Sequence, residues 1–277
     1  MGLPRRASTH LATMRLAAAS SASLGAWRPS VKFCNADAID DKLIALAGEN
    51  KKITGANATL PVSLAIRKVA AAAKGLPLYQ YLNPNANTLP IPMFNVLNGG
   101  AHAEGNVDLQ EFMLMPVGAS SFGEGLRMVS EVFQILKKKT KVGVGDEGGV
   151  APSLSSNEEA LKIIAECVQT AGYKLGSDFK IALDPASSEL WNHAEEEKAA
   201  KGKYYFWKGS KELFSSEQMI NMYADWVSKY SIVSIEDGLG EFDDAGQTAF
   251  TQKLGGQIQL VGDDYFVTNP KIFKEKG

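Results

Sequence analysis

The sequence is poor in cysteine and histidine, has no long apolar run and carries almost no net charge, and these shortages exclude several classes of protein. Two cysteines cannot make the disulfide framework of a small secreted domain. No apolar run reaches the roughly 20 residues that a membrane-spanning helix needs. The 29 basic and 31 acidic side chains nearly cancel, so no overall field attracts nucleic acid or an anionic membrane. We expect a soluble intracellular protein whose partner is a small molecule, with no binding to nucleic acid or membranes.

Acidic residues are also missing from the first 36 positions, where arginine, serine, threonine and alanine prevail. This composition is typical of an organellar transit peptide. Non-native sequence from a misplaced gene start is the main alternative, and a secretory signal ranks third because serines dilute the apolar stretch 16–24. We therefore leave residues 1–36 out of the predicted fold.

The remaining sequence predicts two parts of different character. Residues 37–85 are rich in Ala, Leu and Lys and predict a small helical domain, with Gly75 ending a helix. From residue 86 to 277, short apolar runs alternate with helical patterns that begin at Ser-x-x-Glu or Ser-x-x-Gln. This alternation of strand and helix predicts an α/β fold of the βα-barrel type, with about five of the eight strands of a closed barrel.

Three of the apolar runs each finish on a carboxylate, at Asp184, Glu236 and Asp263. Continuous Ile, Val and Leu runs are typical of strands buried on both faces in a parallel sheet flanked by helices. Such folds keep their chemistry at the C-terminal ends of the strands. Because carboxylate oxygens suit Mg²⁺, the pattern predicts a metal site at which these three side chains converge on one ion.

Three further residues are candidates for the same site. Glu147 lies between glycines, which allow the backbone to bring an acid close to a ligand, although an ordinary turn with solvated acids is the commoner meaning of this pattern. Glu111 begins a buried strand, where a charged residue should be paired or functional. His102 lies in the Gly-rich loop before that strand, and by itself a loop histidine is more often a surface residue without a functional role.

Taken together, these segments resemble the enolase family. The resemblance runs in order from about residue 40 to the C-terminus and rests on short motifs. They are Gly55-Ala56-Asn57-Ala58, Val62-Ser63-Leu64-Ala65, Pro77-Leu78-Tyr79, Asn95-Val96-Leu97-Asn98-Gly99-Gly100, His102-Ala103, Gln110-Glu111-Phe112-Met113, Gly145-Asp146-Glu147-Gly148-Gly149, Ala186-Ser187-Ser188-Glu189, Val233-Ser234-Ile235-Glu236-Asp237, Gly262-Asp263-Asp264 and Val267-Thr268-Asn269.

The resemblance implies an Mg²⁺-dependent dehydration of 2-phosphoglycerate to phosphoenolpyruvate, a step of glycolysis. It implies that Asp184, Glu236 and Asp263 hold the metal that binds the substrate carboxylate, and Glu236 and Asp263 thereby contribute to substrate binding. Glu147 matches the acid that helps to expel the C3 hydroxyl, and His102 and Glu111 match residues that line the substrate. The family also implies a cytoplasmic homodimer, or an organellar location if residues 1–36 are a transit peptide.

Enolases take their catalytic lysine from the strand after the one that ends at Asp263, and this sequence stops at Gly277. We therefore expect a chain truncated at both ends, with a reduced N-terminal domain, a doubtful dimer and no measurable dehydration. Three hypotheses follow: an active enolase, a non-catalytic enolase fragment that keeps the acids for Mg²⁺, and another acid-sugar lyase or racemase of the same superfamily. The Gly145–Gly149 and His102 motifs favour the first two.

Overall fold

The computed structural model describes residues 35–48, 51–145 and 147–277, and the chain divides into two units between Leu89 and Pro90. Nearly all of the predicted tail over 1–36 lies outside the described residues, and the domain boundary predicted between residues 85 and 86 stays a prediction. In the ranges that are described, no helix is both long and apolar enough to cross a membrane.

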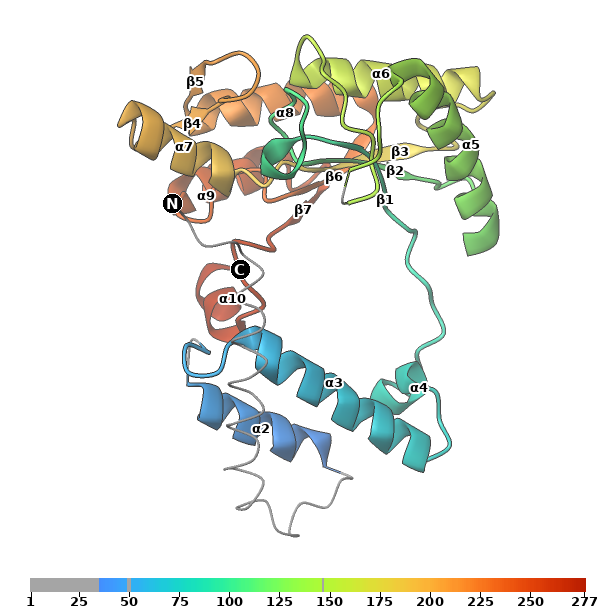
Figure 1. Cartoon of the computed structure of the whole chain (residues 1–277), viewed down its shortest axis with the longest axis vertical. Coiled ribbons are helices and arrows are strands. Elements are labelled where there is room, and N and C mark those ends of the chain that lie inside the picture. The colour runs from blue at the N-terminus through green and yellow to red at the C-terminus, as the bar shows by residue number, and fades with distance from the viewer. Residues whose placement is uncertain (1–34, 49–50, 146) are drawn as a thin grey trace. The chain divides into compact units, whose positions relative to one another are not determined.

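The first unit is helical, as the sequence predicted. It contains α2 (Ala36–Ala47), α3 (Ala56–Ala73) and the short α4 (Leu78–Leu82), drawn in blue and teal in Figure 1. The side chain of Asn35 caps α2 by accepting a hydrogen bond from the backbone N–H of Ala38 at 3.1 Å. Arg67 of α3 forms ion pairs with Asp37 and Asp40 of α2, which joins the two helices.

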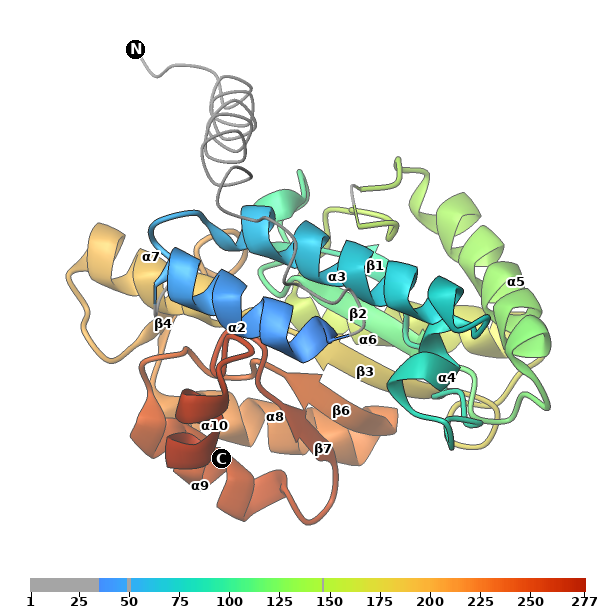
Figure 2. The same ribbon diagram turned by 90° about the horizontal axis from the view of Figure 1, so that it is seen from below.

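The second unit is built on one sheet of five strands in the order β1-β2-β3-β6-β7, seen side by side in Figure 2. The strands are β1 (Phe94–Asn98), β2 (Glu111–Met115), β3 (Lys180–Asp184), β6 (Ile232–Glu236) and β7 (Gln259–Val261). β3, β6 and β7 are parallel, whereas β2 is antiparallel to both of its neighbours. The predicted α/β class and partial barrel are confirmed: within the described residues the sheet is open and does not close.

Helices and one hairpin complete the second unit. The helices are α5 (Phe122–Thr140), α6 (Asn157–Thr170), α7 (Ser188–Lys198), α8 (Ser216–Tyr230), α9 (Asp244–Leu254) and α10 (Pro270–Lys276), and β4 (Tyr204–Tyr205) pairs with β5 (Leu213–Phe214). The three predicted serine caps are present at Ser121, Ser156 and Ser215. The full reciprocal capping box forms at Ser215, because Gln218 also accepts from the Ser215 backbone.

The sheet has a helix-covered face and an opposite face, and strand alternation assigns each residue to one of them. Helices α5, α6 and α8 lie over one face (Figure 1). The strand residues in the core with these helices include Phe112, Leu114, Ile181, Leu183 and Ile235. The residues between them, Met113 on β2, Ala182 on β3 and Ser234 on β6, pair with one another across the sheet and belong to the opposite face. This opposite face carries the candidate site.

Candidate active site

Three acidic residues lie next to one another at one edge of the sheet. Glu111 of β2 pairs directly with Asp184 of β3. In the parallel ladder between β3 and β6 the last pair is Leu183 with Ile235, so the residues that follow it, Asp184 and Glu236, are also neighbours. Because β2 is antiparallel to β3, its first residue lies beside the last residue of β3, and β6 is the next strand in the sheet. Glu111, Asp184 and Glu236, called here the acid row, therefore share the face opposite the helices.

The acid row is short of positive charge. Within the described residues, no lysine or arginine forms an ion pair with Glu111, Asp184 or Glu236. Burial and the nearby charge of Glu236 raise the pKa of Asp184 to about 8. Burial also raises the pKa of Glu111, with a further contribution from Glu147, and raises the pKa of Glu236, with a further contribution from Asp237. These carboxylates repel one another, and a bound cation would relieve that repulsion.

Asp263 does not lie in a strand, which corrects the prediction that its strand ends on it. β7 ends at Val261, and Asp263 lies exposed in the turn that follows. The buried carboxylate of Asp237 shapes this turn by accepting from the backbone N–H groups of Asp263 at 3.1 Å and Asp264 at 2.8 Å. In the described part of the chain, no three His, Cys, Asp or Glu side chains are arranged to hold a metal ion. The predicted convergence of Asp184, Glu236 and Asp263 on one ion is therefore not seen.

Glu147 lies against the end of β1, where two side-chain amides hold its carboxylate. The amide nitrogen of Asn98 donates to Glu147 Oε2 at 2.7 Å, and that of Gln110 donates to Oε1 at 3.2 Å. Asn98 pairs with Glu111 across β1 and β2, so the loop of Glu147 lies beside the acid row. The effect of the Glu147 charge on Glu111 agrees with this placement.

Gly149 allows the loop to approach β1 this closely. A Cβ at this position would lie 2.3 Å from Asn98 Oδ1 and 2.8 Å from the backbone nitrogen of Leu97. Both distances are far below any ordinary contact, and one of the two atoms belongs to the backbone. The glycine is therefore required here for close approach to the strand.

His102 lies at the end of a short 3-10 turn, Gly100–His102, and its side chain lies outside what the structure describes. The turn itself is held by Lys208, whose ammonium donates to the carbonyl oxygen of Gly100 at 2.7 Å and to that of Ala103. A hollow of about 930 Å³ lies between the loop after this turn and residues 142–145 before Glu147. Its size is that of a small-molecule site.

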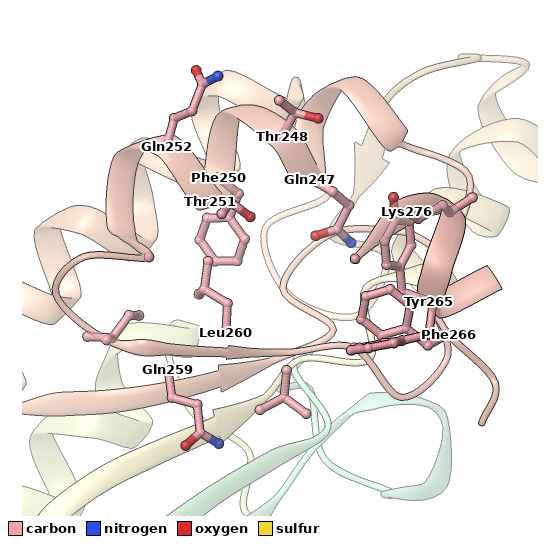
Figure 3. A pocket seen from close by; sticks show the side chains of 16 residues that line it. Gln247, Thr248, Phe250, Thr251, Gln252, Gln259, Leu260, Tyr265, Phe266 and Lys276 are labelled. Atoms are coloured by element: carbon pink, nitrogen blue, oxygen red, sulfur yellow. The ribbon is translucent and has the colours of Figure 1, made fainter. Parts of the chain in front are cut away.

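A second hollow, of about 620 Å³, lies between α9, β7 and α10, away from these loops. Figure 3 shows Phe250 of α9 close to Leu260 of β7, and Tyr265 close to Lys276. The lining is apolar or uncharged apart from Lys276 and contains no carboxylate side chain. We therefore place the candidate site at the acid row.

Two family models match this chain. The model described as the enolase C-terminal TIM barrel domain matches residues 86–276, and that of the enolase N-terminal domain matches residues 10–82. The chain belongs to the enolase family. The N-terminal match begins inside the stretch 1–36 that the sequence analysis set aside, and the C-terminal match covers every described element of the sheet.

The donor set fits the metal that the enolase family implies. Asp184, Glu236 and Asp263 offer only carboxylate oxygens, the ligands that Mg²⁺ prefers, and the first two lie where negative charge is uncompensated. These residues would hold the ion together, since the charge of Asp263 already acts on Glu236. Their assignment as ligands stays a prediction.

Sequence reasoning missed three residues that organise this enolase-type site. Asn98 and Gln110 hold Glu147, and Asp237 holds the turn of Asp263. Each bond to Glu147 joins residues far apart in the chain, which no local pattern reveals. Asp237 did carry a signal, since it directly follows Glu236 at a strand end, the place where polar side chains of such folds gather.

Proposed function

We propose that this enolase-family lyase dehydrates 2-phosphoglycerate to phosphoenolpyruvate and depends on Mg²⁺. The observation that carries the proposal is the acid row, a set of neighbouring carboxylates that no cation of the described chain neutralises. Membership of the enolase family supports the reaction.

Each residue of the candidate site has a separate role in the proposed reaction. A base must accept the weakly acidic proton beside the substrate carboxylate, a role that the enolase resemblance gives to a lysine without a match in this sequence. Removing that proton builds up negative charge on the substrate, and this charge must be stabilised. Asp184, Glu236 and Asp263 would hold Mg²⁺, which supplies concentrated positive charge when bound. Glu147 assists the departure of the C3 hydroxyl by donating a proton to it. Glu111 and His102 line the substrate from the neighbouring strand and turn.

An absorbance assay for phosphoenolpyruvate on the purified protein tests the proposal. The proposed function requires turnover that depends on Mg²⁺ and falls about 100-fold or more in Glu147→Gln, because the substituted amide cannot donate a catalytic proton. The absence of turnover, expected in the sequence analysis because the family's lysine has no match in this sequence, is the competing outcome. Glu212→Gln, an exposed glutamate of the hairpin, is the matched control and should keep full activity. Mg²⁺ binding without turnover would contradict the proposal and favour a non-catalytic enolase fragment.

The location and assembly implied by the family stay predictions. We expect a cytoplasmic protein, or an organellar one if residues 1–36 direct import, and the homodimer of the family is the assembly to test. Cell fractionation and light scattering of the purified protein measure these two properties.

A further inference from the structure

Asn98 makes the most direct contact between a sheet strand and Glu147. Its side chain is only 3% exposed. Its amide nitrogen donates to Glu147 Oε2 at 2.7 Å, and its amide oxygen accepts from the backbone N–H of Gly149 at 2.7 Å. The nitrogen of the Asn98 amide therefore binds the side chain of Glu147, and its oxygen binds the backbone of Gly149, one residue on each side of Gly148.

The direction of these bonds follows from chemistry. A backbone N–H can only donate, so the oxygen of the Asn98 amide must face Gly149. The nitrogen must then face Glu147, where it donates to Oε2 of the carboxyl group. An ionised aspartate at position 98 could still accept from Gly149 but could not donate to Glu147. Asparagine is thus the side chain of this size that satisfies both partners.

The strand also fixes where Asn98 lies. It is the last residue of β1, pairs with Glu111, and its backbone N–H donates to the carbonyl oxygen of Val150 at 2.8 Å. The backbone N–H of Val150 donates in turn to the carbonyl oxygen of Val96 at 3.0 Å. The loop of Glu147 is consequently anchored to the sheet by its backbone, and the Asn98 side chain adds the shorter of two amide bonds to the carboxylate, the other coming from Gln110 at 3.2 Å.

We propose that Asn98 is a positioning residue of this site: its amide orients the Glu147 carboxylate toward the substrate. The catalytic part of this inference rests on the proposed function, because the role of Glu147 in catalysis comes from that function. The geometric part, that Asn98 directs Glu147, can be tested without turnover.

The test uses Asn98→Asp, which keeps the size of the side chain and replaces the donor with a second carboxylate. The matched control is Asn106→Asp, since Asn106 clamps Leu154 with the same pair of bonds, at 2.7 and 2.6 Å, without touching Glu147. The third variant combines Asn98→Asp with Glu147→Gln, because a glutamine at 147 can donate to an aspartate at 98 and restore the bond with its direction reversed.

Two measurements separate the inference from the proposed function. In hydrogen exchange, the Gly149 amide should exchange about tenfold faster in Asn98→Asp, because repulsion between the new carboxylate and that of Glu147 moves the loop away from β1 and weakens the bond to Gly149. The rate should return toward that of the wild type in the double variant. In kinetics, Asn98→Asp should lower kcat about 100-fold with KM changed less than about twofold, while Asn106→Asp keeps its kcat.

The possible results decide between the two claims. A wild-type kcat in Asn98→Asp, or exchange in the double variant that stays as fast as in the single variant, would overturn the inference. If the wild-type protein shows no turnover at all, the proposed function fails, and the exchange of the double variant still decides whether Asn98 directs Glu147.

Discussion

The second unit holds buried carboxylates in two kinds of surroundings. Asp108 is 3% exposed and accepts from the backbone N–H groups of Lys208 and Gly209 and from the side chain of Asn157. Asp243 is 8% exposed and accepts from Tyr204, from Ser216 and from the backbone of Gly246. The carboxylates of the acid row are less deeply buried, yet they face one another.

The comparison shows that burial alone does not mark a functional acid. Asp108 and Asp243 each have a full set of donors, as expected of groups that hold a fold together. In the acid row, the described side chains provide repulsion and few donors, which costs stability unless something else binds there. The structure thus separates buried acids with a full set of donors from acids that lack a cationic partner among the described residues.

The largest expected effect is the loss of a satisfied acid. Asp243→Ala removes the partner of the buried Tyr204 hydroxyl and the N-cap of α9. We expect the free energy of unfolding in urea to fall by about 3 kcal/mol. Asp244→Ala is the control: this neighbouring acid is exposed and bonded to Tyr265 and Lys276 at the surface, and its loss should cost less than about 1 kcal/mol. Equal losses of unfolding free energy in the two variants would show that the buried bonds of Asp243 stabilise the protein no more than the exposed bonds of Asp244.

A somewhat smaller effect is expected where the loop of Glu147 meets β1. Gly149→Ala forces a Cβ to within 2.3 Å of Asn98 Oδ1, and we expect it to lower the free energy of unfolding by about 2 kcal/mol. Gly143→Ala provides the comparison, because its Cβ would meet no atom within 4 Å and should leave stability nearly unchanged. Calorimetric melting of both variants measures the difference, and a stable Gly149→Ala would refute the close approach.

The same substitution should have opposite effects in the two surroundings. Asp108→Asn places an amide nitrogen among groups that donate, so we expect a loss of about 2 kcal/mol. Asp184→Asn keeps the oxygen that accepts from Ala186 and removes a carboxyl group whose pKa burial raises, so that folding no longer costs the free energy of neutralising it, and we expect a gain of up to about 1 kcal/mol without metal. Urea unfolding at neutral pH compares them. If Asp184→Asn were more destabilising than Asp108→Asn, the distinction between acids with a full set of donors and the acid row would be wrong.

The smallest expected effect concerns the turn after β7. Asp263→Ala should weaken Mg²⁺ binding about fivefold, because it removes one of three carboxylates from an incomplete shell. Asp264→Ala changes the adjacent exposed acid and should bind Mg²⁺ nearly as the wild type does. Titration calorimetry with Mg²⁺ measures both affinities, and identical losses in the two variants would remove Asp263 from the proposed ligand set.

The sequence predicted the elements well where one local pattern decides them. The runs that end at Asp184 and Glu236 are strands with the acid in the last position, and the three serine caps lie where the Ser-x-x-Glu and Ser-x-x-Gln patterns place them. The enolase resemblance is confirmed over most of the chain. These features depend on neighbours within a few residues, which a sequence displays directly.

The remaining features depend on contacts between distant residues. The alternation of strand and helix predicted a parallel sheet, but β2 returns antiparallel after a loop without a crossover helix, and this reversal brings Glu111 beside Asp184. Likewise, nothing local distinguishes Asp108 from the functional acids, because its donors come from positions 157, 208 and 209. Chain direction and long-range donors are set by tertiary packing.

The central proposal is that Asp184 and Glu236 of the acid row bind a cation, and the dependence of stability on Mg²⁺ tests it most directly. The free energy of unfolding is measured at increasing Mg²⁺ for the wild type and for Asp184→Asn. The account predicts that the wild type gains stability with the logarithm of Mg²⁺ concentration above its dissociation constant, while Asp184→Asn gains much less. A wild type that does not respond to Mg²⁺, or a variant that responds equally, would contradict it.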